Sequence, residues 1–206
     1  MHYTSPVNRL MVFCIAGWSG FFVMGVELLS GRILAPSFGN GIYVWGGIIT
    51  VFMLALSLGY LAGGHLSLRR PTLRKLALLL LLAAAATAPI ALFADALLDR
   101  LFDAIHDPRY GSLVSATLLF FVPTAICGMV SPYAVRLLVT EYRQSGQVAG
   151  LLYFVSTLGS AAGTLLTSFY LVLYLDVAQI LWGMTGVSLV LGGTGAVVGR
   201  AGHEPR

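Results

Sequence analysis

The chain has 206 residues, of which 58% are hydrophobic and only 10% carry a charge, and its formal net charge is +4. A soluble domain carries about 25% charged residues, so this composition leaves too few charges to cover a water-facing surface. The sequence therefore excludes an ordinary soluble domain and predicts an integral membrane protein. Because the positive charges fall in short loops between apolar segments, the net charge does not indicate nucleic-acid binding.

Six segments have the roughly 20 apolar residues that a membrane-spanning helix needs. We expect one all-α membrane domain over residues 1–206. No segment has the layout of a cleaved signal peptide, so we expect the first span to be retained. The expected spans are Leu10–Ser30, Ile42–Leu66, Leu76–Leu98, Leu113–Val139, Val148–Leu175 and Ala178–Val198.

The placement of Lys and Arg predicts the orientation, because cytoplasmic loops carry an excess of these residues. With the N-terminus inside, the inner side holds nine cations: Arg9, Arg69, Arg70, Arg74, Lys75, Arg136, Arg143, Arg200 and Arg206. The outer side holds three: Arg32, Arg100 and Arg109. We therefore expect both termini to be cytoplasmic.

Glu27 is a carboxylate inside the first expected span. An ionised carboxylate in hydrocarbon costs roughly 2.5–3.5 kcal/mol on insertion scales, so Glu27 is a candidate functional residue. Two alternatives remain open: an ion pair with Arg32 that fixes the following loop, or a role in binding or chemistry. With the span ending at Ser30, Glu27 is expected near the outer end. Expected at its level are Arg32, Asn40, Tyr43 and Trp45, with His106, Arg109, Tyr110, Tyr170, Tyr174 and Asp176 from other spans.

The segment Ala94–Ser112 is the longest polar stretch, and its aspartates recur every four residues with apolar residues between them. This spacing predicts an amphipathic helix that continues the third span and bends along the outer interface. Its acidic side is either a solvated face or a rim that attracts cations or amines. The aspartates are Asp95, Asp99, Asp103 and Asp107.

The fourth expected span contains Pro123 and Pro132, with Gly128 and Ser131 beside them. A proline removes a backbone hydrogen bond and kinks a helix, and transporters place substrates at broken helices. The alternatives are a packing kink or a substrate-lining break. Arg136 follows one turn later, near the inner surface, where it either contributes to the site or extends its head to water.

An internal repeat is indicated by two similar phrases, Leu58–Gly64 and Leu158–Thr164, which both contain GxxxG. GxxxG lets helices approach closely. Each phrase lies in the middle span of three, so the pattern predicts a 3+3 inverted repeat like half of a major-facilitator fold.

Metal and cofactor sites are not indicated. Cys14 and Cys127 lack metal-ligand spacing and are expected to be packing residues. The sequence contains no phosphate-binding glycine loop, nucleophile elbow or zinc motif, so we expect no metal and no cofactor.

Two longer phrases carry a family resemblance: ExxxGRxxAPxxGxxxYVWGxIIxVFxxALxLGYxxGG over Glu27–Gly64, and PTxxxGMxSPYxxRL over Pro123–Leu137, followed by GxxAGLLYxxSTLGSxxGTLL. Together they resemble the membrane domain of the spermidine synthase-like bacterial membrane proteins, often labelled fused major-facilitator/spermidine-synthase proteins, over about residues 10–175. The resemblance implies a bacterial cytoplasmic membrane. The motif includes Glu27, Arg32, Tyr43, Trp45, Ser131 and Arg136.

Longer members of that family carry a soluble polyamine-synthase-like Rossmann domain after the spans. This sequence ends at Arg206, so we expect the soluble domain to be absent and the chain alone not to make spermidine. The resemblance leaves two possibilities: a separate soluble spermidine-synthase-like protein docks on the basic inner loops, or the membrane domain has its own activity at the outer cluster.

The leading hypothesis is a membrane module of a polyamine-synthase-like system that presents or processes an amine- or lipid-bearing substrate at the outer leaflet. Glu27 and Arg32 are its candidate catalytic residues, and Asn40, Tyr43, Trp45, Ser131 and Arg136 its candidate binding residues. One alternative is a small homodimeric transporter of a cationic substrate. Another is a non-catalytic assembly partner that uses the glycine-rich faces of the second, fifth and sixth spans.

Overall fold

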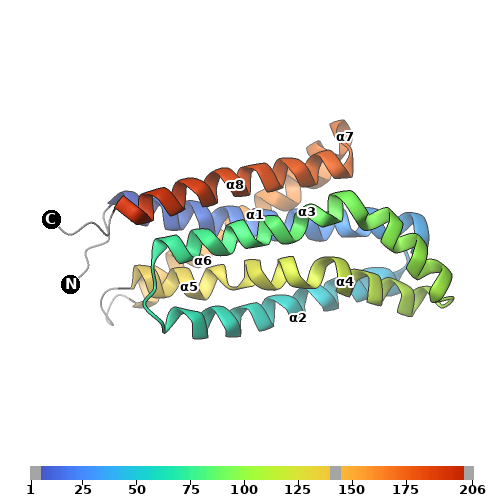
Figure 1. The fold of residues 1–206 in the computed structure, drawn as a ribbon, viewed down its shortest axis with the longest axis horizontal. Coiled ribbons are helices and arrows are strands. Elements are labelled where there is room, and N and C mark those ends of the chain that lie inside the picture. Colours follow the sequence, from blue (N-terminus) through green and yellow to red (C-terminus); the bar gives the residue numbers. More distant parts are fainter. Residues whose placement is uncertain (1–5, 140–144, 202–206) are drawn as a thin grey trace.

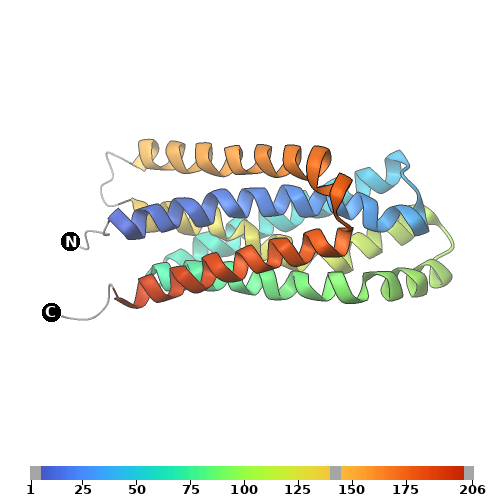
Figure 2. The same ribbon diagram turned by 90° about the horizontal axis from the view of Figure 1, so that it is seen from above.

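The computed structural model describes residues 6–139 and 145–201 of the chain. Within this part the regular elements are helical, and six helical segments are long and apolar enough to cross a membrane. This confirms the predicted all-α fold with six spans. The helices form one elongated bundle, and the first and last described residues lie at the same end (Figures 1 and 2). The spans are Pro6–Phe38, Ile42–Ser67, Leu73–Ala104, Pro108–Leu138, Ser145–Tyr174 and Val177–Arg200.

The first helix, α1 (Pro6–Phe38), continues well past the expected end at Ser30. It ends where Gly39 adopts a φ of 76°, the left-handed conformation that glycine adopts without strain, and the Gly39 N–H donates to the Ala35 carbonyl at 2.9 Å. The helix therefore ends at a glycine and not at the first polar residues. This longer helix changes the depth at which Glu27 lies.

The second and third helices are α2 (Ile42–Ser67) and α3 (Leu73–Ala104). Thr72 caps the start of α3, where its hydroxyl accepts a hydrogen bond from the Lys75 N–H at 3.3 Å. Pro89 lies inside α3, and Figure 1 shows that α3 bends in its second half. A proline inside a helix is a sufficient cause for such a bend.

The acidic segment Ala94–Ser112 is divided between two helices. α3 ends at Ala104, and α4 (Pro108–Gly128) begins after a short turn. Asp107 caps α4 by accepting from the Arg109 N–H at 2.9 Å, and Pro108 occupies the first helical position, where no N–H is needed. The segment therefore bends through a turn that starts a new span.

The fourth span consists of α4 and α5 (Val130–Leu138), which are separated at Met129. Pro132 lies in the first turn of α5, where its missing N–H breaks no bond within that helix. The break is short, because the Met129 N–H still reaches the Ile126 carbonyl at 3.1 Å and the Tyr133 N–H reaches the Met129 carbonyl at 3.3 Å.

The fifth span begins as α6 (Ser145–Leu166), passes through a π-helical turn (Thr167–Leu171) and ends as the short α7 (Val172–Tyr174). The last span is α8 (Val177–Ala201), which follows after a tight turn. A π-helical turn inside a span is uncommon and is frequently found at functional sites.

The two halves of the bundle are interlocked. The second helix of each half packs on the first helix of the other half, so α2 lies against α4 and α6 lies against α1, while α3 and α8 pack on each other. Figure 1 shows α1 and α4 running in opposite directions along the bundle. This arrangement is the one that a 3+3 inverted repeat requires.

The seam between α2 and α4 depends on the first predicted GxxxG phrase. A Cβ added at Gly59 would meet the backbone of Ala125 and Gly128, and one at Gly63 would meet the backbone of Met129. The helices therefore approach so closely that only glycine fits at these two positions of α2.

The seam between α6 and α1 repeats this geometry. A Cβ at Gly159 would meet the Gly17 backbone, and one at Gly163 would meet the Phe21 backbone. Gly159 and Gly163 of α6 stand 100 positions after Gly59 and Gly63 of α2. Phe21, the partner of Gly163, likewise stands 108 positions before Met129, the residue after α4 that is the partner of Gly63. The two seams thus match position for position.

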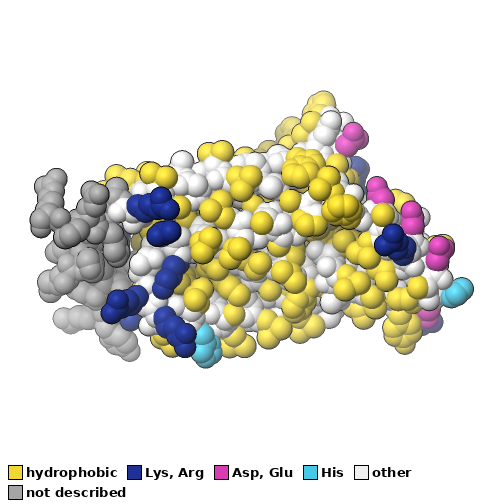
Figure 3. Space-filling model, viewed as in Figure 1, with side chains coloured by type: hydrophobic (Ala, Val, Ile, Leu, Met, Phe, Trp, Pro, Cys, Tyr) yellow, Lys and Arg dark blue, Asp and Glu magenta, His cyan; other side chains and the backbone are white. Residues whose placement is uncertain are grey.

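Apart from Glu27, the described charged residues gather at the two ends of the bundle (Figure 3). What we call the basic end carries Arg9, Arg69, Arg70, Arg74, Lys75, Arg136 and Arg200. What we call the acidic end carries Asp95, Asp99, Asp103, Asp107 and Asp176, together with Arg32, Arg100 and Arg109. Arg143 and Arg206, which were expected on the basic side, lie outside the described residues. Between the two ends the surface is predominantly apolar, as a bilayer requires.

Candidate functional site

The depth of Glu27 follows from the contacts between α1 and α8. A Cβ at Gly25 would meet Met184, and a Cβ at Gly195 would meet Ile15, so the two helices run antiparallel in a fixed register. Counting along α8 from Met184, Glu27 lies level with the second turn of a helix that starts at Val177, about 8 Å below that start at a rise of 1.5 Å per residue. Glu27 therefore lies deeper than the sequence predicted, between the midplane and the surface at the acidic end.

Glu27 lies on a face of α1 that packs on α6 before Glu27 and on α2 after it. Two turns before Glu27 on this face, Gly20 contacts Ser156 of α6; one turn after it, Gly31 contacts Trp45 of α2. A Cβ at Gly31 would lie 2.5 Å from the Trp45 ring atom Cζ2. Residues four apart are neighbours on a helix face, so Glu27 lies one turn along α1 from the position that Trp45 contacts, where α1 passes from α6 to α2.

The Glu27 side chain is half-buried. Within the described residues its carboxylate has no hydrogen bond or ion pair, and the hydrogen bond at this position goes from the Ser30 hydroxyl to the Glu27 backbone carbonyl at 2.6 Å. The surrounding core at this level of α1 is apolar, with Val26 and Leu29 fully buried. Glu27 is therefore an unpaired carboxyl group in the membrane-spanning part of the bundle.

Arg32 does not pair with Glu27, although the sequence made it the nearest candidate. Because α1 continues as a helix through both positions, a separation of five residues places the two side chains about 140° apart around the axis. Arg32 is exposed. It lies on the face that contacts α8, and the register places it level with Val177, the first residue of α8, at the acidic end. The ion-pair alternative is thus not realised in this structure.

Tyr43 lies at a shallow surface pocket at the acidic end. The pocket has a volume of about 640 Å³ and is lined by Tyr43, His106, Asp107, Pro108 and Arg109. Its walls come from the start of α2 and from the turn between α3 and α4. Asn40 is exposed in the loop that precedes α2.

Asp107 and Arg109 form the one ion pair among the described residues, with a distance of 3.3 Å between Arg109 Nε and Asp107 Oδ1. The pKa of the Asp107 carboxyl is lowered, chiefly because it accepts the backbone N–H of Arg109 and also because it accepts the Arg109 side chain. This carboxylate is committed to capping α4, so it is a poor candidate for a free ligand group.

Ser131 and Arg136 lie apart from the other predicted site residues. Both belong to α5, which extends toward the basic end (Figure 1), whereas Tyr43 and Trp45 belong to the first turn of α2 and Glu27 to the second half of α1. Arg136 is exposed and Ser131 is half-buried beside the α4–α5 break. The predicted residues therefore fall into two groups that do not share one pocket.

Sequence reasoning missed two features near Glu27. Gly31 was not singled out, although its missing side chain admits the Trp45 ring. Thr167 begins the π-helical turn opposite Gly25, and its buried hydroxyl has no hydrogen-bond partner among the described residues. A threonine within a long apolar run was the available signal for this position.

Metal binding is not supported among the described residues, where no group of three or more His, Cys, Asp or Glu side chains comes together. Cys127 is buried, and its backbone carbonyl accepts the Ser19 hydroxyl at 3.3 Å, while Cys14 is exposed. The arrangement around Glu27 is one carboxyl group with an indole ring one turn away. Such a pair can hold an ammonium group, because the carboxylate supplies the charge and the ring face attracts cations.

Comparisons with protein-family models, curated proteins and solved structures find no match for this chain.

Proposed function

We propose that this chain is the membrane module of a polyamine-synthase-like system, and that it holds an amine-bearing substrate at the leaflet of its acidic end. Glu27 is the anionic partner of the amine and Trp45 provides the adjoining aromatic surface. The observation that carries the proposal is the unpaired, half-buried Glu27 carboxyl beside the Gly31–Trp45 contact. A charge retained in a membrane span without a protein partner is a functional-site hypothesis by default.

The geometry favours binding over chemistry. Within the described residues no titratable group forms a hydrogen bond or ion pair with Glu27, and a general acid–base mechanism needs a second positioned group or the substrate itself. The proposed role is therefore to hold and present the amine at the leaflet of the acidic end. The excess of cations at the basic end supports a cytoplasmic location for that end by the positive-inside rule, and in this orientation Glu27 faces the outer leaflet.

The test is binding of spermidine to the purified protein in nanodiscs, measured by calorimetry and by tryptophan fluorescence. Glu27→Gln removes the charge and keeps the shape of the side chain. A lost charge-assisted bond weakens affinity by at least about tenfold. Trp45→Phe should remove the fluorescence change and weaken binding by a smaller factor.

Asp99→Asn is the matched control, because Asp99 is an exposed carboxylate of α3 at the acidic end. Its effect on affinity should stay within about twofold at physiological salt, where exposed charges are screened. Equal losses in Glu27→Gln and Asp99→Asn would indicate a diffuse surface effect and contradict the proposal.

A homodimeric transporter of a cationic substrate is the second candidate, and one observation favours it. α6 packs on α1 with one narrow face and leaves most of its other side chains uncovered; Leu152 and Gly163 are its buried residues. In an inverted-repeat unit of six spans, this uncovered face is available to a second copy. Saturable uptake of radiolabelled spermidine into proteoliposomes, abolished in Glu27→Gln, would favour transport over presentation.

As the alternative to an activity at the outer leaflet, a soluble spermidine-synthase-like partner is proposed to dock at the basic end, on the loop between α2 and α3. Arg69, Arg70 and Arg74 are exposed there, and an acidic surface is their electrostatic complement. Co-purification with such a protein should be lost when these three arginines are changed to Gln. A partner with a basic docking face would contradict this part of the proposal.

A further inference from the structure

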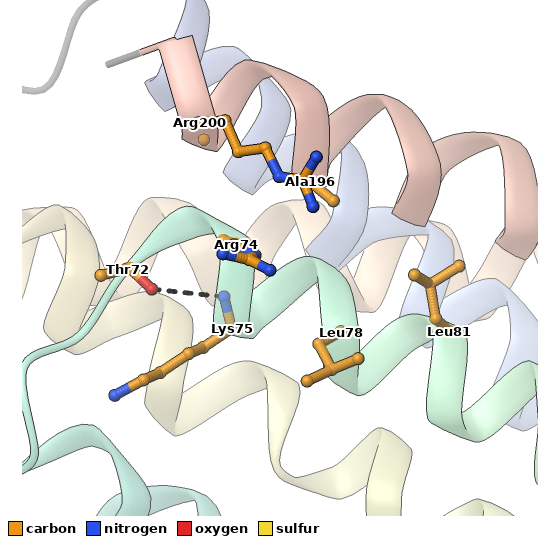
Figure 4. Close-up of a pocket in the computed structure, with 8 residues that line it drawn as sticks. Thr72, Arg74, Lys75, Leu78, Leu81, Ala196 and Arg200 are labelled. Atoms are coloured by element: carbon orange, nitrogen blue, oxygen red, sulfur yellow. Dashed lines mark hydrogen bonds between the residues drawn. The ribbon is translucent and has the colours of Figure 1, made fainter. Parts of the chain in front are cut away.

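A groove at the basic end lies between α3 and α8, far from Glu27. Its volume is about 650 Å³, and it is lined by Thr72, Arg74, Lys75, Leu78, Leu81, Ala196, Gly199 and Arg200. Figure 4 shows that one wall comes from the first turns of α3 and the other from the last turns of α8. The groove therefore opens at the level where the membrane meets the cytoplasm in the proposed orientation.

Each wall carries a cation at its end and apolar side chains below it. On α3, Arg74 is followed by Leu78 after one turn and by Leu81 after two turns, so these three side chains share one face. On α8, Arg200 lies one turn beyond Ala196, and Figure 4 shows its side chain reaching back along the groove toward Ala196. The groove is therefore amphipathic, with its charge at the membrane edge and its apolar part toward the membrane interior.

The two arginines have no partner within the described residues. Neither Arg74 nor Arg200 makes an ion pair or a side-chain hydrogen bond there. Lys75 differs, because its ammonium donates to the carbonyls of Arg69 at 2.7 Å and Arg70 at 3.2 Å. In Figure 4 the Lys75 side chain accordingly points away from α8. Arg74 and Arg200 are the cations that remain for a ligand.

The start of α3 adds to this positive potential. Arg74 and Lys75 lie in its first turn, which contains no acidic residue, although the N-terminus of a helix favours negative charge. Gly199 brings α8 against this turn, since a Cβ there would lie 2.9 Å from the Arg74 backbone nitrogen. The described acidic residues are Glu27 and the aspartates of the acidic end, so none of them neutralises the groove.

We infer that the groove binds an anionic phospholipid of the cytoplasmic leaflet. The phosphate lies between Arg74 and Arg200, and one acyl chain follows Leu78 and Leu81. Basic pockets between transmembrane helices on the cytoplasmic side are suited to anionic head groups. The apolar floor selects a lipid over a free phosphate ion, because burial against leucine contributes only when an acyl chain is present.

The experiment is native mass spectrometry of the full chain released from nanodiscs that contain phosphatidylglycerol and phosphatidylcholine in equal amounts. The wild-type protein should retain phosphatidylglycerol preferentially. The double variant Arg74→Gln/Arg200→Gln should lose this preference by about 25-fold, from a contribution of about fivefold per arginine near the surface. Arg136→Gln is the matched control, because Arg136 is an exposed cation of α5 at the same end but does not line the groove.

Two further arms identify the ligand and the role of the apolar floor. Addition of inorganic phosphate at millimolar concentration should leave the retained phosphatidylglycerol unchanged, whereas displacement by phosphate would show a simple anion site. Leu78→Gln/Leu81→Gln should weaken retention while both arginines remain. Equal retention of the two lipids by the wild-type protein would overturn the inference. So would equal losses in Arg136→Gln and the double arginine variant.

Discussion

Trp45 of α2 lies with its indole ring over Gly31 of α1, one helical turn from Glu27. This contact exists because position 31 has no side chain; a Cβ there would lie 2.5 Å from the ring. The contact joins α1 and α2 at the level where α1 no longer packs on α6. It also gives Glu27 an aromatic neighbour, which is the basis of the proposed amine site.

Gly31→Ala is therefore expected to displace the Trp45 ring. Overpacking of this kind costs about 1–3 kcal/mol, and the ring would move from its place one helical turn from Glu27. We expect weaker spermidine binding and a shifted tryptophan emission. Gly64→Ala is the control, because an added Cβ at position 64 of α2 meets no atom within 4 Å. Wild-type binding in Gly31→Ala would show that the Trp45 position does not matter for the site.

Because the two seams have corresponding contacts, alanine in place of glycine should lower the free energy of unfolding by a similar amount in each. In Gly59→Ala and Gly159→Ala the added Cβ meets the backbone of the facing helix, so the helices must separate, at an expected cost of about 1–3 kcal/mol each. Unfolding titrations with a denaturing detergent measure this cost. Gly183→Ala, on an open face of α8, should be neutral or slightly stabilising because alanine is the better helix former. A clear loss in only one of the two seam variants would argue against the structural repeat.

The cap of α4 predicts a dependence on acid pH. The pKa of Asp107 is lowered in the folded protein, so its contribution to stability is fully present above the pKa of the unfolded chain, about 3.9. That contribution is lost as the pH falls through the lower folded pKa. The thermal unfolding midpoint of the wild-type protein should therefore fall more between pH 5 and pH 3 than that of Asp107→Asn.

Arg109→Gln separates the two causes of this lowered pKa. The backbone N–H of Arg109 is the larger cause and the side chain is a smaller one. We therefore expect Arg109→Gln to lower the unfolding midpoint at pH 7 less than Asp107→Ala does. The reverse order would show that the exposed ion pair, and not the cap, stabilises the start of α4.

Tyr133 connects α5 to the start of α3. Its side chain is fully buried, and its hydroxyl accepts the Thr72 N–H at 2.9 Å. Tyr133→Phe should cost about 1 kcal/mol in unfolding titrations, the net value of one hydrogen bond. Because Thr72 lines the groove between α3 and α8, the variant should also reduce the preference for phosphatidylglycerol. An unchanged preference would show that the bond between Tyr133 and Thr72 does not position the groove.

The sequence was sufficient for the number of spans and for the helix seams. Apolar runs of the required length predict spans directly, because a helix satisfies the backbone hydrogen bonds of such a run within the segment itself. The two GxxxG phrases likewise predicted close helix contacts, although the sequence did not show that each phrase would pack on the other half of the chain. The packing of each half on the other depends on the whole bundle and not on any local pattern.

The candidate site was less predictable, for reasons that begin with the end of α1. Polar residues after Ser30 suggested that the span stops there, but a membrane helix continues until its backbone finds a cap, here at Gly39. The longer helix places Glu27 deeper and turns Arg32 to another face. Ser131 and Arg136 were grouped with the outer residues by motif alone, and the direction of α5 separates them.

The groove between α3 and α8 was not visible in the sequence. Arg74 and Arg200 were predicted on the same side of the membrane, but positive charge near a membrane surface is common to cytoplasmic loops. Only the packing of Gly199 against the start of α3 brings the two arginines to one groove.

The central claim, that Glu27 contacts the amine of a bound substrate within the membrane, is tested most directly by chemical protection. A hydrophobic carbodiimide is applied to the protein in nanodiscs, and the modified carboxyl groups are located by peptide mass spectrometry with and without spermidine. We expect modification of Glu27 in the free protein and strong protection of Glu27 by saturating spermidine, with unchanged modification elsewhere. Modification of Glu27 to the same extent in the presence of spermidine would contradict the account.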